Sequence, residues 1–99
     1  MIIVHAFLHA RTEHRAAFAR TLRDLQAATL EHDPGCSYYA CYADIDDPDR
    51  FVCVEQWTDA ESVRAHLAAP HYLEADAVLD RLRAEPAEVH VFTAEGTRL

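Results

Sequence analysis

The sequence predicts an α+β domain with the ferredoxin-like order β-α-β-β-α-β, in which helices cover one face of a four-stranded antiparallel sheet. Three observations lead to this prediction. Four short segments carry strand-like patterns, two longer segments carry apolar residues at helical spacing, and clear turn signals separate them. The chain has 99 residues, of which 51% are hydrophobic, so we expect residues 1–99 to form a single domain with one core.

The first expected strand runs from Met1 to Ala10, and its side chains alternate between two faces. The two faces consist of Ile2, Val4, Ala6, Leu8 and of Ile3, His5, Phe7, His9. Both faces are mostly apolar, so both should be covered. A helix follows, with Thr12 as its expected N-cap and with apolar residues at helical spacing, namely Phe18, Leu22, Leu25 and Ala28. The turn signal Asp-Pro-Gly at residues 33–35 should end this helix.

Residues 36–43 (CSYYACYA) and 51–57 (FVCVEQW) are two further expected strands, which the polar turn between them joins into a hairpin. In the first of these strands Tyr38 and Tyr42 should share one face, and Tyr39 should lie on the other. In the second strand Glu55 and Trp57 share a face. Either that face points away from the helices, or the strand contains a bulge.

The second helix is expected to begin at Thr58, because Thr58-Asp59-Ala60-Glu61 fits the capping-box pattern. Pro70 should interrupt this helix, and a second helical segment then runs from about residue 71 to residue 83. The stretch EVHVFTA, residues 88–94, is the expected fourth strand.

Composition narrows the possible partners. The formal net charge of −8 argues against nucleic acid, and no apolar run approaches the ~18 residues of a membrane span. The apolar N-terminal segment has no basic region before it and is expected to be a strand, not a signal peptide.

Cys36, Cys41 and Cys53 are odd in number, and the first two should point to opposite faces of a strand. We therefore expect reduced cysteines in a cytoplasmic protein.

Four segments are similar, in order and spacing, to the antibiotic biosynthesis monooxygenase family. They are DPGC at 33–36, SYYACYADIDDPDRF at 37–51, VEQW at 54–57 and AHLAAPHY at 65–72, and the resemblance covers nearly the whole chain. That family consists of dimeric α+β barrels. It includes cofactor-free quinol and anthrone oxygenases, and an autoinducer-processing isomerase is among its relatives.

The resemblance implies a homodimer in which two sheets pack through their open faces, with a pocket between each sheet and its helices. Val4, Ala6 and Leu8 would then face the pocket. The residues that would face the dimer interface are Ile3, His5 and Phe7.

The resemblance also bears on the substrate and the cofactor. Trp57 matches a Trp of the anthrone oxygenase pocket, but Cys53 and Val63 stand where Asn and Tyr would be expected, which argues against anthrone. Haem-degrading relatives carry an Asn on the first strand and a haem-ligating His on the last helix. The positions that match these two are Ala6 and Asp76, so no haem is expected. The sequence contains no flavin, nucleotide or haem motif, and no cofactor is expected.

His66 and His71 are the most conspicuous candidate site residues. On a continuous helix they would point about 140° apart. A break at Pro70 could re-aim His71, but no third ligand stands at a suitable spacing and Asp76 alone is a weak addition, so no metal site is expected. His66 is a candidate general base or hydrogen-bond donor to a substrate oxygen, or it pins the helix break. His71 follows Pro70 in the first turn of the next segment, where it would satisfy backbone groups or close the pocket mouth.

Asp76 lies beside Tyr72 at the edge of an apolar helical stripe. Either Asp76 meets Tyr72 or a histidine in the pocket and has a raised pKa, or it pairs with Arg64 or with an arginine of the last helix. The residues expected to bind substrate, together with His71, are Trp57, Tyr72, Tyr39 and Ala6. For Trp57 the alternative is a core position.

Three functional hypotheses follow. The first is cofactor-independent oxidation of a quinol-type or anthrone-type aromatic by O2, with His66 and Asp76 as the catalytic residues. The second is isomerisation or degradation of a small oxygenated metabolite, as in the autoinducer-processing relatives. The third is a non-catalytic dimer that binds a small aromatic molecule.

Overall fold

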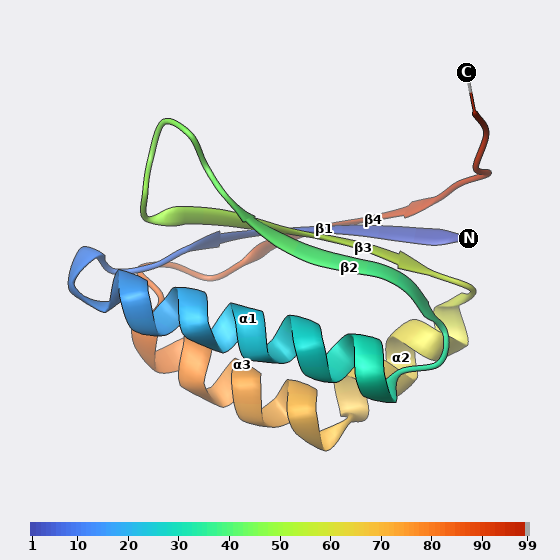
Figure 1. Ribbon diagram of the computed structural model, residues 1–99, viewed down its shortest axis with the longest axis horizontal. Helices are drawn as coiled ribbons and strands as arrows, with labels where there is room; N and C mark the ends of the chain where they lie inside the picture. Colours follow the sequence, from blue (N-terminus) through green and yellow to red (C-terminus); the bar gives the residue numbers. More distant parts are fainter. Residues whose placement is uncertain (99) are drawn as a thin grey trace.

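The computed structural model describes residues 1–98 as two layers, a four-stranded antiparallel sheet and three α-helices on one of its faces (Figure 1). The elements in chain order are β1 (Ile2–His9), the 3-10 turn η1 (Thr12–His14), α1 (Arg15–His32), β2 (Cys36–Ala43), β3 (Arg50–Trp57), α2 (Ala60–Ala68), α3 (Pro70–Leu82) and β4 (Glu88–Thr93). In space the strands follow the order β2-β3-β1-β4, so β2 and β4 are the edges. The predicted ferredoxin-like fold is confirmed.

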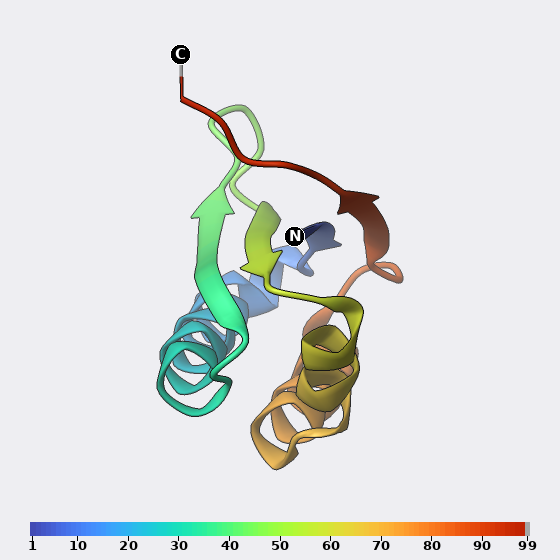
Figure 2. The same cartoon turned by 90° about the vertical axis from the view of Figure 1, so that its right-hand side faces the viewer.

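The helices form two columns under the sheet. Figure 2 shows α1 beneath the β2 side, and α2 and α3 beneath the side that carries β1. The apolar stripe of α1 is buried as its spacing predicts, with Phe18, Leu22 and Leu25 in the core. In the part of the chain that the structure describes, none of the helices has the length and apolar character that crossing a membrane requires.

Both predicted N-caps differ from the observed ones. Thr12 begins η1, and its hydroxyl donates to the Asp49 carboxylate at 2.5 Å, so α1 starts only after this turn. The cap of α2 is Asp59, whose Oδ1 accepts the backbone N–H of Ser62 at 2.8 Å. Asp59 takes this role from Thr58 because it directly precedes the first helical residue and its carboxylate is a strong acceptor.

The predicted helix break is confirmed. Helix α2 ends at Ala68, Ala69 is extended, and Pro70 occupies the first position of α3. This arrangement is expected, because the residue before a proline is disfavoured in helical conformation and proline itself suits the first turn.

A register shift between Cys36 and Tyr38 changes which side chains of β2 face the helices. Tyr39 points to the helices and is buried. Tyr38 and Tyr42 lie on the opposite face, where their hydroxyls form a hydrogen bond with each other, so the predicted division of the tyrosines is confirmed. Because the extra residue resets the alternation, Cys36 and Cys41 both lie on the helix side.

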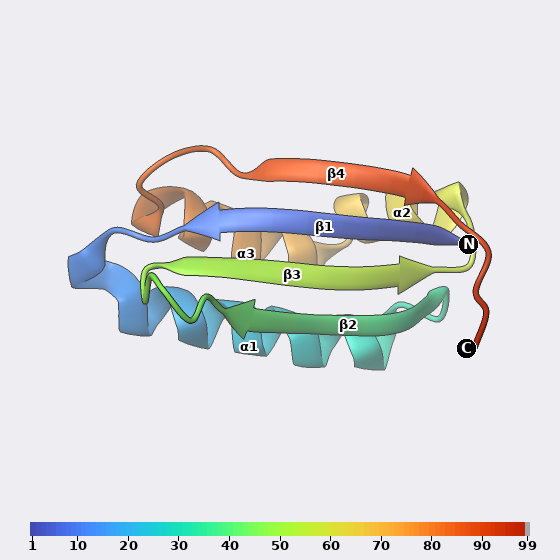
Figure 3. The same cartoon turned by 90° about the horizontal axis from the view of Figure 1, so that it is seen from above.

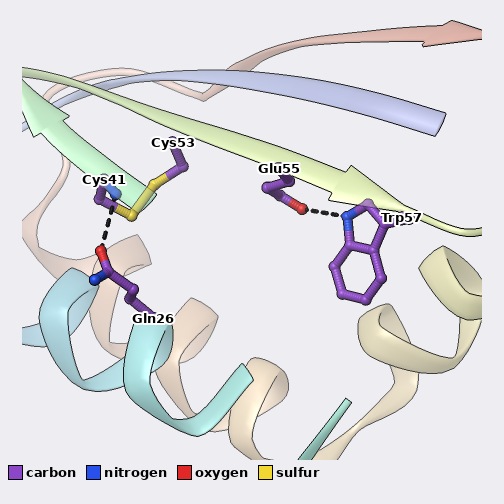
Figure 4. The surroundings of a disulfide bond; sticks show 5 residues. All are labelled: Gln26, Cys41, Cys53, Glu55 and Trp57. Carbon is purple, nitrogen blue, oxygen red and sulfur yellow. Dashed lines mark hydrogen bonds between the residues drawn. A yellow bond between two sulfur atoms is a disulfide. The ribbon is translucent and has the colours of Figure 1, made fainter. Parts of the chain in front are cut away.

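The prediction of reduced cysteines is wrong for two of the three. Cys41 and Cys53 stand opposite each other in the β2–β3 pair, with Cα atoms 4.1 Å apart, and form a disulfide (Figure 4). The prediction rested on the spacing of Cys36 and Cys41 along one strand, whereas the disulfide between Cys41 and Cys53 depends on the register between two strands. Cys36 is free. A cytoplasmic location stays a prediction.

Strand β3 turns a continuous row of side chains toward the helices, consisting of Phe51, Cys53, Glu55 and Trp57. Both predicted alternatives for Glu55 and Trp57 are therefore wrong, since the two side chains face the helices together and the irregularity lies in β2. Figure 4 shows Glu55 and Trp57 on the same side of β3 as the disulfide.

The other face of the sheet carries no helix in the described residues, and Figure 3 looks directly onto it. We call it the open face. Its aromatic side chains gather on β1 and β4, where the rings of His5 and Phe92 have centroids 5.4 Å apart and those of Phe7 and His90 5.8 Å apart. Phe7 and Phe92 are both exposed.

Gly35 lies where the chain leaves α1 and passes close to the start of α2. Its carbonyl accepts the backbone N–H of Thr58 at 2.9 Å, and a Cβ at this position would collide with the Ser62 side chain. A glycine is needed here because of close packing and not because of backbone conformation, since Gly35 does not have a positive φ.

Gly35→Ala should lower the free energy of unfolding by about 1–3 kcal/mol, the usual cost of forcing an extra methyl group into a packed site. Urea denaturation followed by circular dichroism measures this change. Gly96→Ala is the matched control, because there a Cβ meets only the flexible end of Met1 at 3.2 Å. Equal stabilities of the two variants would contradict the packing argument.

Candidate active site

A cavity of about 150 Å³ lies between the sheet and the helices. Apolar side chains form most of its wall, and Ala6 lines it together with Val4 and Leu8, as expected for that face of β1. Six side chains with polar groups also line it, namely Tyr39, Glu55, His66, Tyr72, Asp76 and Arg83. A cavity of this volume can hold a molecule the size of benzene.

The cavity reaches the surface beside β4. Val89 and Val91 line it from positions opposite Ala6 and Val4 in the sheet, yet they are 53% and 61% exposed. No other strand lies beyond β4, so its inward side chains remain accessible. A ligand can therefore enter along this edge of the sheet.

His66, in the last turn of α2, is the most deeply buried polar group of the cavity wall, at 2% exposure. Its Nδ1 lies 2.6 Å from Oδ2 of Asp33, and its ring packs against Trp57 and Tyr72, with centroids 4.8 and 5.0 Å away. Burial lowers the pKa of His66, and the Asp33 carboxylate opposes this effect. Because Asp33 does not line the cavity, Nε2 is the ring nitrogen left for a bound molecule. His66 therefore lines the pocket and also joins the helix break to α1, and its role as a base or donor stays a prediction.

Asp33 is the C-cap residue of α1, and its carboxylate is shared by two histidines. His71 Nε2 lies 2.9 Å from the same oxygen that His66 Nδ1 contacts. The two histidines converge because they lie on separate helices on either side of Pro70, so the break re-aims His71, and Asp33 supplies a third group that the sequence did not indicate. Their nitrogens and the Asp33 oxygen lie within 4.8 Å of one another, a donor set that can hold a metal ion.

His71 and Trp57 were expected to bind substrate, and the structure places neither in the cavity wall. His71 turns toward Asp33 and borders a separate surface groove between α1 and α3. Trp57 is fully buried behind the wall, which agrees with its alternative prediction as a core residue.

Glu55 is a second buried titratable group in the cavity, at 7% exposure. Trp57 Nε1 donates to its Oε1 at 2.9 Å (Figure 4). Burial raises the pKa of Glu55 to about 7, although the hydrogen bond from Trp57 favours the ionised form. Near neutral pH this carboxyl group can therefore either accept or donate a proton.

Tyr39 and Tyr72 present hydroxyl groups to the cavity from opposite layers. Burial raises the pKa of each hydroxyl, with Glu55 adding to the effect at Tyr39 and Asp76 at Tyr72. Both hydroxyls stay protonated at neutral pH and can donate hydrogen bonds to a ligand.

Asp76 pairs with Arg83, as one of its two predicted alternatives states. Arg83 Nη2 donates to Asp76 Oδ1 at 3.1 Å, and Arg83 follows directly after α3. Arg83 Nε is buried and forms no hydrogen bond in the described residues, but the Asp80 carboxylate lies 3.5 Å from it. The guanidinium group at the cavity wall is thus held between two carboxylates, Asp76 and Asp80.

Sequence reasoning did not identify Asp33, Glu55 or Arg83 as site residues. In the sequence Asp33 is recognisable only as part of the Asp-Pro-Gly turn. In the structure that turn lies at the same end of the helix layer as the break at Pro70. Glu55 carried a clearer signal, because a lone carboxylate within a run of apolar strand residues is costly to bury and often functional.

The model of the antibiotic biosynthesis monooxygenase family matches residues 1–78. No curated protein matches the chain. Among solved structures, a protein from Deinococcus radiodurans that is provisionally assigned as an antibiotic biosynthesis monooxygenase is 27% identical, with a TM-score of 0.91 over 100% of this chain and 97% of that one.

Two further structures are similar along nearly their whole length. A protein from Chloroflexus aurantiacus with the same provisional assignment is 27% identical, with a TM-score of 0.83 over 98% of this chain and 95% of that one. The protein Rv0793 from Mycobacterium tuberculosis is 25% identical, with a TM-score of 0.88 over 97% and 96%. The match of the family model over most of the chain, together with this shared fold, shows that the chain belongs to the antibiotic biosynthesis monooxygenase family.

Proposed function

We propose that the protein is a cofactor-independent monooxygenase that oxidises a single-ring quinol with O2. The observation that carries this proposal is the setting of His66. Its ring is buried in the wall of an apolar cavity, Asp33 holds its Nδ1 from outside, and its Nε2 is available to a molecule inside. This is the arrangement that a general base requires.

The reaction needs no electrons beyond those of the substrate. His66 takes the proton of a ring hydroxyl, and the resulting electron-rich anion reduces O2. One oxygen atom is inserted at a ring carbon and the other leaves as water, so a quinol and O2 give a hydroxyquinone and water. The quinol supplies all four electrons that O2 accepts.

The remaining polar groups of the cavity support the anion and the proton transfers. The guanidinium group of Arg83 offers a positive charge for the substrate oxyanion, and Tyr39 and Tyr72 offer hydroxyl donors. Glu55, with a pKa of about 7, supplies a proton to the reduced oxygen atom. Asp76 acts through Arg83 as a positioning residue, not as the acid or base predicted from sequence.

The size of the cavity supports a single-ring substrate. A volume of about 150 Å³ holds one aromatic ring, whereas an anthrone has three fused rings. Cys53 and Val63, which stand where the resemblance to anthrone oxygenases implies Asn and Tyr, both line this cavity.

A second candidate function is isomerisation of a small oxygenated metabolite. Glu55 and His66 favour it, because two buried proton-transferring groups in one small cavity can deprotonate and reprotonate a substrate without O2. Turnover at the same rate without oxygen would favour this function over oxidation.

We also propose that the protein is a homodimer through the open face. Phe7 and Phe92 would be an unusual exposed aromatic pair on the surface of a monomer, and the helices leave this face bare. Pairing two copies through the same face gives a closed two-fold assembly.

His66→Gln should lower the rate of quinol oxidation by about 10²–10⁴-fold, because it removes the base. The assay follows oxygen uptake with a panel of single-ring quinols in air, without added metal or flavin, and anthrone serves as the oversized control. His14→Gln is the matched control and should keep the wild-type rate, since His14 lies outside the cavity. A folded His66→Gln variant with full turnover would contradict the assignment.

The unfolding free energy should depend on the protonation of Glu55. Its pKa is about 7 in the folded protein and near 4.5 in the unfolded chain, so the folded state binds the extra proton between these values. Stability from this group is therefore present at low pH and is lost as pH rises from about 4.5 to about 7, by up to about 3 kcal/mol.

Urea denaturation across this pH range tests the effect. The difference in unfolding free energy between wild type and Glu55→Gln should shift in favour of the variant as pH rises. Glu74→Gln, at an exposed position, is the control and should show a constant difference. A constant difference for Glu55→Gln as well would mean that Glu55 is not buried as a proton-binding group.

Phe7→Glu and Phe92→Glu should each convert the dimer into monomers, because each buries a charge in an apolar interface. Size-exclusion chromatography with light scattering measures the mass in solution. Leu30→Glu replaces an exposed apolar residue on the helix layer and should leave the dimer intact. A monomeric wild type, or dimeric Phe7 and Phe92 variants, would exclude this interface.

A further inference from the structure

We propose that Asp33, His66 and His71 form a binding site for one divalent transition-metal ion of the zinc class. Nothing in the oxidation chemistry requires this site, although the two share His66. Its basis is the convergence of two imidazole nitrogens on one carboxylate oxygen, at 2.6 and 2.9 Å, with all three ligand atoms within 4.8 Å of one another.

These separations suit a shared ion. With zinc–ligand distances of about 2.1 Å, two ligands of a tetrahedral ion stand about 3.4 Å apart. The two contacts with the Asp33 oxygen need to lengthen by less than about 1 Å to reach this spacing. Rotations of side chains can supply such movements without a change in the backbone.

The backbone holds the three ligands from separate elements. Asp33 caps the end of α1, His66 lies in the last turn of α2, and His71 lies in the first turn of α3. Pro70 sets the direction of the chain between the two histidines. The side chains of Asp33, His66 and His71 are 11%, 2% and 17% exposed, so the site is largely removed from water, with its most open side at His71.

The donor set indicates the class of ion. Two imidazoles and one carboxylate suit zinc, cobalt or nickel, whereas magnesium and calcium prefer oxygen ligands alone. In the metal-free protein a nitrogen of each ring faces the same Asp33 oxygen, so each of these nitrogens must carry a proton to form its hydrogen bond. A divalent cation replaces those protons and satisfies all three groups at once.

The site lies behind His66 and outside the substrate cavity. His66 is the only one of the three ligands among the residues that line the cavity in the described part of the chain. A bound ion would contact Nδ1 of His66 and join the ends of three helices. Because an ion on Nδ1 leaves the ring proton on Nε2, His66 cannot act as a base while the ion is bound, and we therefore assign the ion a regulatory role in which it joins the helix ends and suppresses the base.

Equilibrium dialysis of the chelator-treated full chain against zinc chloride, followed by elemental analysis, tests the proposal. Wild type should bind one zinc ion per chain. Asp33→Asn and His71→Gln should each weaken binding by at least about tenfold, the lower end of the loss that follows removal of even an indirect partner of a metal ligand. His14→Gln and Cys36→Ser are the controls and should bind as wild type does, since they remove a distant histidine and the free thiol.

Cobalt chloride provides a second measurement on the wild-type protein, which does not depend on how the variants fold. The visible spectrum should show the intense bands of a tetrahedral ion and no charge-transfer band from a thiolate. Absence of zinc binding by wild type, equal binding by all variants, or loss of binding in Cys36→Ser would each overturn the proposal. Oxygen uptake by the metal-free protein tests the proposed oxidation separately, so either proposal can fail without the other.

Discussion

The arrangement of the helix layer depends on the two contacts that the Asp33 carboxylate makes with histidines. One oxygen atom contacts both His66 and His71, so the end of α1, the end of α2 and the start of α3 meet at a single point. Removing this acceptor would leave two partly buried imidazoles without a partner, which costs more than the loss of an ordinary surface hydrogen bond. The same contact holds the His66 ring against the cavity, so the stability of the helix layer and the geometry of the site depend on one side chain.

The elements of the fold could be predicted because they follow from local patterns. Alternation in β1, helical spacing in α1 and the proline break after α2 are each visible in a few consecutive residues. The errors concern features that depend on neighbours distant in sequence. Thr12 turns away from α1 because Asp49, in another loop, accepts its hydroxyl. The Cys41–Cys53 pair depends on the register between β2 and β3, which the spacing of residues along one strand does not reveal.

The candidate site was partly predictable for the same reason. Helical periodicity placed His66 and Tyr72 near the inward face, and strand alternation predicted that a tyrosine of β2 would line the cavity, which is Tyr39. The inward position of Ala6 was implied by the family resemblance. Asp33 acts through His66 and His71 on two other helices, which the sequence does not bring together. Glu55 and Arg83 have partners close in sequence, Trp57 and Asp76, but their place in the cavity wall depends on how the sheet and the helices pack. Trp57 shows the opposite error, a residue that was predicted to line the site and does not. The family resemblance implied that it lines the pocket, whereas in the structure it is buried behind the cavity wall and donates a hydrogen bond to Glu55.

Strand β4 has a consequence for how such a protein can diversify. Val89 and Val91 form part of the cavity wall, yet they belong to an edge strand and contribute little to the buried core. Substitutions at exposed positions usually change stability by no more than about 0.5 kcal/mol. Selection can therefore alter the shape of the cavity through β4 at little risk to folding, while His66 and Glu55, anchored in the core, stay in place. Under the proposed function, an unchanged set of proton-transferring groups could in this way serve a succession of different substrates.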